Sequence, residues 1–340
     1  YIKESDKTGD LVHRFLTEQR QINAGKMNRF ANASDAAGLT MGYWDISDTT
    51  EYKLAQQYTL CDNFFHSAFG GSFLNHSFLI ASAPMVFPSA PASLIETFDA
   101  NGNYINDAAV TPDFYDVNTT RSVQFHAASD TNLANLTPVQ TYTTIGDLLT
   151  AKGVTWKWYS GGLKDALAGH PDPLFQFHHQ PFLYTKTYAP GTAAQVAHVQ
   201  DLSDFMNDIA NGTLPQVVFY KPIGEDNLHP GYANISDGEA HLQTIISALQ
   251  ASPQYKDMMI IITFDEHGGQ WDHVAPPTRD RWGPGSRVPA IVVSPFAKKG
   301  YIDHTQYDTG SILKTIEERF GLPTLTSSDA AVVSMRNTLQ

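Results

Sequence analysis

The sequence is poor in cysteine, in long apolar runs and in basic residues, and each of these shortages excludes a class of protein. Its 340 residues include one cysteine, Cys61, so an internal disulfide framework is excluded. No apolar run approaches the ~18 residues that a membrane-spanning helix needs. Basic residues are scarce, with 22 Lys and Arg against 35 Asp and Glu, and the formal net charge is −13. Because nucleic-acid-binding proteins present basic surface to phosphate, no nucleic acid partner is expected.

The chain also lacks an initiator methionine and a signal peptide, since it opens with Tyr-Ile-Lys-Glu-Ser-Asp. We therefore expect a processed or truncated product. The low basic content, together with 19 Pro and 15 Tyr, favours a secreted or periplasmic location. A hydrophobic content of 42% and a charged content of 17% are typical of a globular protein that buries a large core.

Apolar segments of strand length alternate with amphipathic segments through the last two-thirds of the chain. The predicted helices there are residues 144–151, 198–210, 237–250 and 309–320. The predicted strands are residues 154–159, 216–220, 258–265 and 288–294. This alternation indicates an α/β fold with a mostly parallel central sheet sandwiched by helices. Residues 9–23 and 48–58 also have helical spacing, whereas residues 85–140 predict a long, irregular surface insertion.

The strand-like segment 258–264 ends in the polar sequence DEHGGQWDH. An apolar run without alternation is typical of a strand buried on both faces, and ligands bind beyond the carboxyl ends of such strands. Asp265 and Glu266 occupy that position and offer hard oxygen donors suited to a divalent metal. The alternative for such a pair is a turn or a helix cap, but further polar side chains in the same loop favour the metal. The side chains that would orient the ligands are His267, Asp272 and His273.

A second polar segment, GGSFLNH, places the hydroxyl of Ser72 directly after two glycines. The residues that follow could start a helix, whose N-terminus offers unsatisfied N–H groups to an anion such as phosphate. The simpler alternative is that Ser72 only caps this helix. The G-x-S-x-G turn of acyl-transferring hydrolases is absent, because Leu74 stands two residues after Ser72. Acyl transfer is therefore not expected.

Histidines lie in two further loops. His178 and His179 are adjacent in the aromatic segment FHHQPF, and His229 lies in KPIGEDNLHPGY after a predicted strand. A lone histidine is often only a satisfied core residue, whereas a pair in a proline-containing loop favours a functional role. Imidazoles at these positions could bind phosphate oxygens or protonate a leaving group.

The segments GSFLNH, FHHQPF, KPIGEDNLHPGY and TFDEHGGQWDHVAPP together resemble the phosphoesterase family of bacterial and fungal acid phosphatases and bacterial phospholipases C, within the alkaline phosphatase superfamily. The resemblance covers nearly the whole chain from about residue 12. It implies an alkaline-phosphatase-like fold in which residues 1–340 form a single catalytic domain. It also implies hydrolysis of phosphate esters through a phosphoserine intermediate.

The resemblance assigns a metal site as well. Ser72 matches the nucleophile, which is also a metal ligand, and Asp265 and Glu266 match the carboxylates that hold one divalent ion. Oxygen-rich ligands admit Ca, Mg, Mn, Fe or Zn, so the identity of the ion stays open.

The remaining family residues surround the substrate phosphate. Asn75, His178 and His229 match residues that bind it, and the role of His76 stays open. Either His229 or His179, when protonated, could donate a proton to the leaving group as a catalytic residue. An acidic pH optimum follows from that requirement.

Two departures from the family pattern carry consequences. The family opens with a buried strand that ends in a Glu-Asn pair and supplies two further metal ligands, and no such strand occurs before Ser72. We therefore expect the native protein to have this strand, and an N-terminal fragment of the same protein is a candidate partner. The chain also ends soon after the predicted helix 309–320, without the β-rich domains of many phospholipases, which favours the acid phosphatase branch.

The expected function is metal-dependent hydrolysis of small phosphate monoesters. A phospholipase C-type phosphodiesterase is the first alternative, since the motifs are shared between the two branches. A non-catalytic protein that binds a metal or an anion is the alternative from another class, since the fold could persist without its first strand.

Overall fold

Helices and short strands alternate along the whole chain in the computed structural model, which describes residues Tyr1–Gln340. The helices are α1 (Phe15–Ile22), α2 (Thr50–Gln57), α3 (Ser72–Ala81), α4 (Ile145–Lys152), α5 (Leu163–Leu167), α6 (Ala193–His198), α7 (Leu202–Asn211), α8 (Ile235–Ala251), α9 (Thr309–Phe320) and α10 (Ser327–Ala330). The strands are β1 (Thr59–Cys61), β2 (Phe64–Phe65), β3 (Met85–Val86), β4 (Thr97–Phe98), β5 (Tyr104–Asn106), β6 (Tyr115–Asp116), β7 (Trp156–Ser160), β8 (Val199–Asp201), β9 (Val217–Lys221), β10 (Ile260–Thr263), β11 (Ala290–Val293), β12 (Tyr301–Asp303) and β13 (Tyr307–Asp308). The predicted α/β class is confirmed.

Three parallel strands form one sheet, in the order β8-β7-β9. Trp158 in the middle of β7 pairs with Val199 on one side and with Phe219 on the other. These side chains are buried in the largest hydrophobic cluster together with Leu149 of α4. Burying one large apolar side chain stabilises the fold by about 1.5–3 kcal/mol, so this cluster is a main source of stability.

A second sheet has the order β10-β11-β1-β12. The strand β11 runs antiparallel to both of its neighbours, whereas β1 and β12 are parallel. All residues of β11 are buried, and its alternate side chains enter two different clusters: Ile291 and Val293 pack in one, Ala290 and Val292 in the other. The strand expected to be buried on both faces was residues 258–264, but β10 lies at the edge of this sheet and is only half-buried; β11 is the strand that is buried on both faces. The core strands thus form two main sheets, one parallel and one mixed, rather than the one mostly parallel central sheet that was expected.

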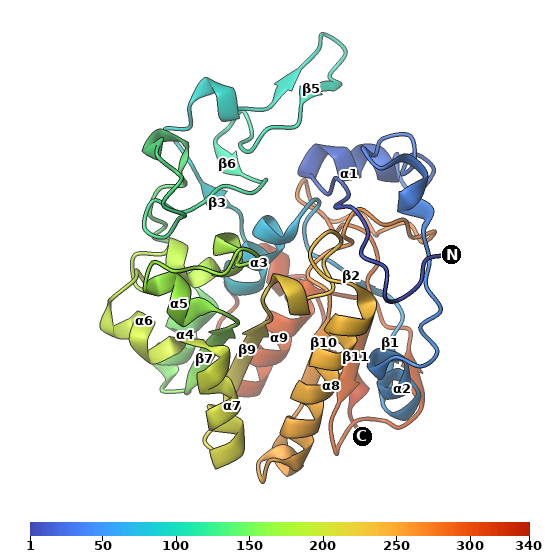
Figure 1. The fold of residues 1–340 in the computed structure, drawn as a ribbon, viewed down its shortest axis with the longest axis vertical. Coiled ribbons are helices and arrows are strands. Elements are labelled where there is room, and N and C mark those ends of the chain that lie inside the picture. The colour runs from blue at the N-terminus through green and yellow to red at the C-terminus, as the bar shows by residue number, and fades with distance from the viewer.

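Helices cover both faces of these strands (Figure 1). In one group α8 contacts both α2 and α7, and the three helices contribute Leu54, Phe205 and Ile245 to one cluster. In the other group α3 contacts both α4 and α9, and the three helices pack in the largest cluster. Trp158 and Tyr159 of β7 are successive residues that enter the two clusters separately, as expected for side chains that alternate between the faces of a strand. None of the helices has the length and apolar character needed to cross a membrane.

Helix ends agree well with the sequence. Gly153, Gly212 and Gly321 follow α4, α7 and α9 in the left-handed conformation that glycine adopts without strain. The helix predicted over residues 9–23 begins only at Phe15, because the preceding segment is extended and lines a cleft. The helix predicted over residues 198–210 begins only at Leu202, because residues 199–201 form β8. The three-residue strand β1 was not predicted, since so short a run shows no periodicity.

The segment 85–140 contains little regular structure beyond the two-stranded pairs β3–β6 and β4–β5. Figure 1 shows it as a separate lobe above α3. Its inner side is nevertheless packed, with Val110 and Val117 fully buried. That the segment is an insertion stays a prediction, but its position makes it one wall of the cleft described below.

Strands β9 and β10 are each hydrogen-bonded to a strand on one side only. Their carboxyl ends lie close together. Lys221, the last residue of β9, donates from Nζ to Oδ2 of Asp265, which lies two residues after β10, at a distance of 2.9 Å. The apolar residues of β10 are only half-buried. We propose that the strand expected upstream of residue 1 pairs beside these edges. Such a strand would join the two sheets and pair the backbone N–H and C=O groups of these edges, which otherwise promote association.

Protein that includes the residues encoded before Tyr1 is expected to unfold several degrees above the chain Tyr1–Gln340, because covering the β10 edge removes apolar surface from water. Thermal unfolding followed by circular dichroism measures the difference. Equal midpoints would contradict a strand at this position. Intact-mass analysis of protein from its natural source would reveal an N-terminal fragment that stays bound.

Candidate active site

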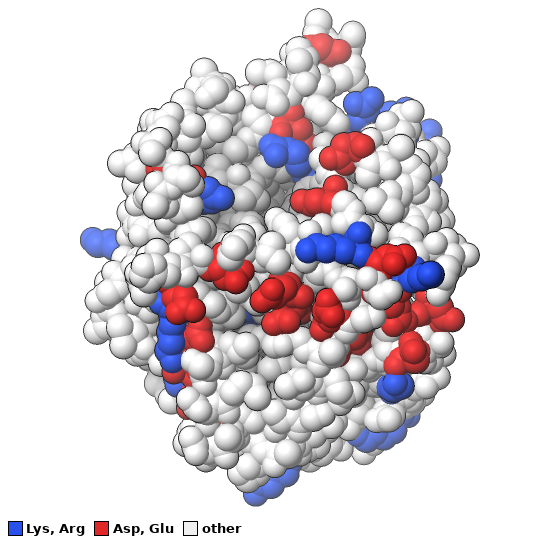
Figure 2. All heavy atoms as spheres, viewed as in Figure 1, with Lys and Arg blue, Asp and Glu red and all other residues white.

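A cleft of about 960 Å³ opens between the extended segment before α1, the start of α3 and the inner side of segment 106–136. Figure 2 shows the molecule hollowed on this face, with acidic side chains gathered below the hollow. The polar side chains in its wall include Asp10, His13, Asn118, Arg121, His178 and His229. Two predicted site residues, His178 and His229, therefore line the cleft. Ser72 lies beside it, between the lining residues Gly71 and Phe73.

Ser72 is the first residue of α3, as the sequence predicted, and it is almost fully buried. Its side chain makes no cap hydrogen bond; Gly71 takes the N-cap position. The Oγ atom instead lies 3.4 Å from Oε1 of Glu266, from which it is separated by 194 residues in the chain. Ser72 therefore does not cap α3 with its side chain.

Gly70 gives the loop before Ser72 its path. Its φ of +88° is a left-handed conformation, and a Cβ atom there would lie 2.7 Å from the backbone nitrogen of Phe15. A Cβ on Gly71 would lie 3.0 Å from the ring of His13. The glycine pair therefore allows the loop to approach the segment before α1 closely.

Asp265 and Glu266 follow β10 directly and face two different sets of partners. Oδ2 of Asp265 accepts from Lys221 Nζ at 2.9 Å and lies 3.4 Å from Nε2 of His76. Oε1 of Glu266 faces the Ser72 hydroxyl. Although burial opposes ionisation, Lys221 and His76 hold the pKa of Asp265 below its ordinary value, so this carboxylate is charged. Two carboxylates and a hydroxyl fit the hard-oxygen preference of a divalent cation.

Asn75 is buried one turn into α3, and its amide is fully engaged. Its nitrogen donates to the carbonyls of Ala68 and Gly71, and its oxygen accepts from the Ala68 N–H. In this structure Asn75 holds the loop that carries Ser72. Its contact with phosphate stays a prediction.

His178 and His179 form a short 3-10 helix with Phe177, and only His178 reaches the cleft. His179 is buried with its Nε2 unpartnered, and its ring packs against that of His76 with centroids 5.2 Å apart. Burial lowers the pKa of both His178 and His179. His179 is therefore neutral near neutral pH and poorly suited to donate a proton, which leaves His229 as the stronger candidate.

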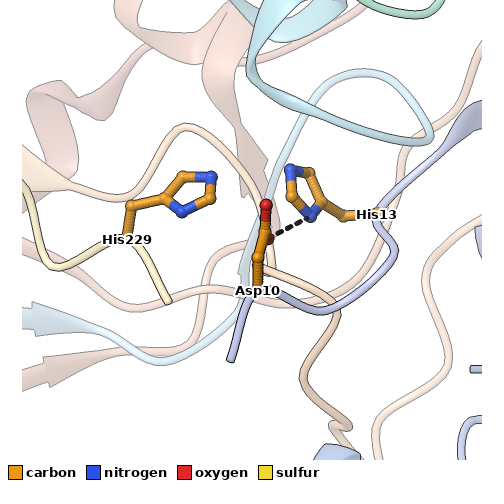
Figure 3. Close-up of side chains that lie close together, drawn as sticks. All are labelled: Asp10, His13 and His229. Carbon is orange, nitrogen blue, oxygen red and sulfur yellow. Dashed lines mark ion pairs between the residues drawn. The ribbon is translucent and has the colours of Figure 1, made fainter. Parts of the chain in front are cut away.

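The sequence analysis did not identify His13, which faces His229 across the cleft (Figure 3). The two rings have centroids 5.2 Å apart, and Nδ1 of His13 pairs with Asp10 at 3.6 Å. Nε2 of His13 lies 3.9 Å from Oε1 of Glu266. Although burial opposes protonation, Glu266 and Asp10 raise the pKa of His13. In the sequence His13 is only a histidine just before an amphipathic helix, and such a position seldom marks a functional site.

The three side chains expected to orient the metal ligands lie in different surroundings. His267 is buried, with its Nε2 atom 3.7 Å from Oε2 of Glu18. Asp272 forms an ion pair with Arg287 at 3.1 Å. His273 is exposed and packs only beside Trp271. Among the three, only His267 is buried in the interior next to Glu266.

Fold and site together define an α/β protein in which a hydroxyl group, two carboxylates and several imidazoles meet at the carboxyl ends of strands. The chain belongs to the Phosphoesterase family, whose sequence profile matches residues 2–323. The resemblance inferred from four short motifs is thereby confirmed.

Similar proteins carry phospholipase names. The chain is 24% identical over 351 residues to "Non-hemolytic phospholipase C" of Pseudomonas aeruginosa, covering 91% of this chain and 44% of that protein. It is 25% identical over 335 residues to "Phospholipase C B" of Mycobacterium tuberculosis, covering 88% and 56%. It is 31% identical over 166 residues to "Non-specific phospholipase C6" of Arabidopsis thaliana, covering 39% and 32%. The chain thus spans about half the length of the bacterial relatives, and assignment to the acid phosphatase branch stays a prediction.

Two solved structures show a distant likeness. One is a protein in the alkaline phosphatase superfamily from Vibrio parahaemolyticus, with a TM-score of 0.45 and 10% identity, covering 85% of this chain and 65% of that one. The other is the phosphonate monoester hydrolase of Silicibacter pomeroyi, with a TM-score of 0.41 and 10% identity, covering 85% and 71%. The family assignment rests on the sequence match.

Replacing His13 with glutamine is expected to weaken the binding of inorganic phosphate about 10- to 100-fold, because a charge-assisted hydrogen bond contributes about 1.5–3 kcal/mol. Isothermal titration calorimetry measures the affinity. His304→Gln is the matched control, since His304 also pairs with a carboxylate, that of Asp62, but is exposed and lies outside the cleft. An unchanged affinity in His13→Gln would contradict an anion site at this histidine.

Proposed function

We propose that this chain is a metal-dependent phosphomonoesterase of the acid phosphatase type, acting through a phosphoserine intermediate. The observation that carries the proposal is the contact of the Ser72 hydroxyl with Glu266 at the N-terminus of α3, beside a cleft lined by imidazoles. A hydroxyl at this point faces the unsatisfied N–H groups of the helix, which favour the negative charge of a phosphoryl group. Membership of the Phosphoesterase family supports the same reaction class.

Asp265, Glu266 and Ser72 would hold the metal ion. When bound, a divalent cation lowers the pKa of the serine hydroxyl and neutralises charge on the phosphoryl oxygens. Lys221 keeps Asp265 charged and oriented for this purpose. Three protein oxygens are fewer than such ions usually take, so substrate, water or the proposed upstream strand would complete the site.

Ser72 would attack phosphorus with its hydroxyl proton released to water, an O–P bond would form, and the bond to the leaving-group oxygen would break. His13 and His229 flank the cleft and would bind the phosphoryl oxygens as charge spreads over them. Nδ1 of His229 donates to the carbonyl of Pro230, so its Nε2 is available to protonate the leaving group. Water would then hydrolyse the phosphoserine. Because His229 acts in its protonated form, we propose an acidic optimum.

A phospholipase C-type phosphodiesterase is the second candidate, favoured by the names of the similar bacterial and plant proteins. The cleft has room for a larger headgroup, since its volume is about 960 Å³. A non-catalytic metal- or anion-binding protein is the candidate from another class. In that case the Ser72–Glu266 contact would have no chemical role.

Ser72→Ala is expected to abolish the release of p-nitrophenol from p-nitrophenyl phosphate, because the variant lacks the attacking oxygen; losses of this kind reach about 10⁴-fold or more. Ser77→Ala is the matched control, since Ser77 lies in the same helix, is buried and donates only to the carbonyl of Ala83. Undiminished turnover in Ser72→Ala would refute the nucleophile. No turnover by the unaltered protein with added metal would favour the non-catalytic alternative.

A side-by-side comparison decides between monoester and diester substrates. We expect kcat/KM for p-nitrophenyl phosphate to exceed that for p-nitrophenyl phosphorylcholine by at least about tenfold. The monoester has three free phosphoryl oxygens and the diester has two, so one more oxygen can meet the cation and the imidazoles of the cleft. A higher kcat/KM on the diester would establish the phospholipase C alternative instead.

A further inference from the structure

A second cluster of metal-binding side chains lies behind the Ser72 loop, outside the cleft. Glu18 of α1, His66 after β2 and His267 after β10 place their ligand atoms within 4.8 Å of one another. Glu18 and His66 are fully buried and His267 is 8% exposed. The two imidazole rings are stacked, with centroids 5.4 Å apart and planes 3° from parallel. Three ionisable side chains therefore share one small, dry volume.

Both histidines are held by their Nδ1 atoms. Nδ1 of His66 lies 2.8 Å from the carbonyl oxygen of Ala68, and Nδ1 of His267 lies 3.3 Å from that of Gln270. A carbonyl oxygen only accepts, so each Nδ1 carries the hydrogen. In a neutral ring this tautomer leaves the lone pair on Nε2, as in histidines that bind a metal through Nε2 while a backbone carbonyl holds Nδ1.

The two Nε2 atoms converge on one carboxylate. Nε2 of His66 donates to Oε1 of Glu18 at 3.0 Å, a hydrogen that a bound metal ion would replace, and Nε2 of His267 lies 3.7 Å from Oε2. The His267 atom is buried and has no hydrogen-bond partner, because 3.7 Å exceeds hydrogen-bonding distance. Ligand atoms at about 2.0–2.1 Å from a tetrahedral ion are about 3.3 Å apart, a separation that lies between the two observed.

Hydrogen bonds from Ser286 and Gly70 orient the carboxylate of Glu18. Its Oε1 accepts from the N–H and the hydroxyl of Ser286, each at 2.8 Å. Its Oε2 accepts from the N–H of Gly70 at 2.6 Å. Carboxylates that bind a metal are commonly fixed by such outer hydrogen bonds. The cluster therefore has the donor set, the orientation and the unpartnered lone pair of a metal site.

We propose that Glu18, His66 and His267 bind a divalent metal ion of the zinc type, distinct from the ion expected at Asp265 and Glu266. Two imidazoles and a carboxylate are donors that zinc accepts readily, whereas the other site offers only oxygen. The ion would tie together α1, the Ser72 loop and the loop after β10. This proposal does not depend on the proposed function, because the ion lies away from the cleft and its role is structural.

The experiment counts zinc in the full chain and identifies its ligands. The double variant Asp265→Asn/Glu266→Gln, purified with zinc and passed over a desalting column, should retain one equivalent by inductively coupled plasma mass spectrometry. X-ray absorption at the zinc edge should show two imidazole ligands. Adding His66→Gln to this background should remove the zinc and lower the midpoint of thermal unfolding by several degrees.

The matched control is His13→Gln in the same background. His13 belongs to the other histidine pair, with Asp10 and His229, which could also collect zinc from solution. Zinc that survives His13→Gln but not His66→Gln supports the buried site. Zinc lost in His13→Gln, no zinc in the folded double variant, or a spectrum with oxygen ligands only would overturn the proposal. If His66→Gln does not fold, the zinc content and spectrum of the double variant decide alone.

Discussion

The buried carboxylate of Glu18 connects the segments on which the active site depends. It accepts hydrogen bonds from the N–H groups of Gly70, in the loop before Ser72, and of Ser286, before β11. It also faces the ring of His267 after β10. His66 and His267 counter the burial of Glu18 and hold the pKa of its carboxyl well below the ordinary value, so the charge is retained in the interior. A neutral amide in this place would lose most of that attraction. The charged carboxylate of Glu18 thus sets the position of Ser72 relative to Glu266, although it contacts neither residue.

The cleft itself is built by segments with little regular structure. Residues 10–14 and 106–136 form much of its walls, and Phe73 reaches it from the start of α3. This division is common in enzymes, where a rigid sheet fixes a few groups and loops supply the rest. The α/β framework therefore determines the position of the polar side chains, and the loops determine the size of the cleft.

Sequence reasoning identified the α/β framework, and it grouped Ser72 with Glu266, two residues that the structure brings together. Apolar runs bounded by glycine, as at Gly153 and Gly321, gave reliable helices and strands, because periodicity and caps are local properties. His13 was missed, since its partner Glu266 is more than 250 residues away and no local pattern records such a contact. His273 was expected near the metal but is exposed, because proximity in sequence says little about direction once a loop turns at two glycines.

The contacts around Glu18 also bear on the order of events during synthesis. Its hydrogen bond to Ser286 spans 268 residues, and the Ser72–Glu266 contact spans 194. Closing loops of this length is entropically costly, and topologies rich in such contacts fold slowly. The loop before Ser72 therefore reaches its final geometry only after most of the chain has left the ribosome. A nascent chain lacking residues beyond 260 has the Ser72 hydroxyl but not the Glu266 carboxylate that lies beside it in the folded protein.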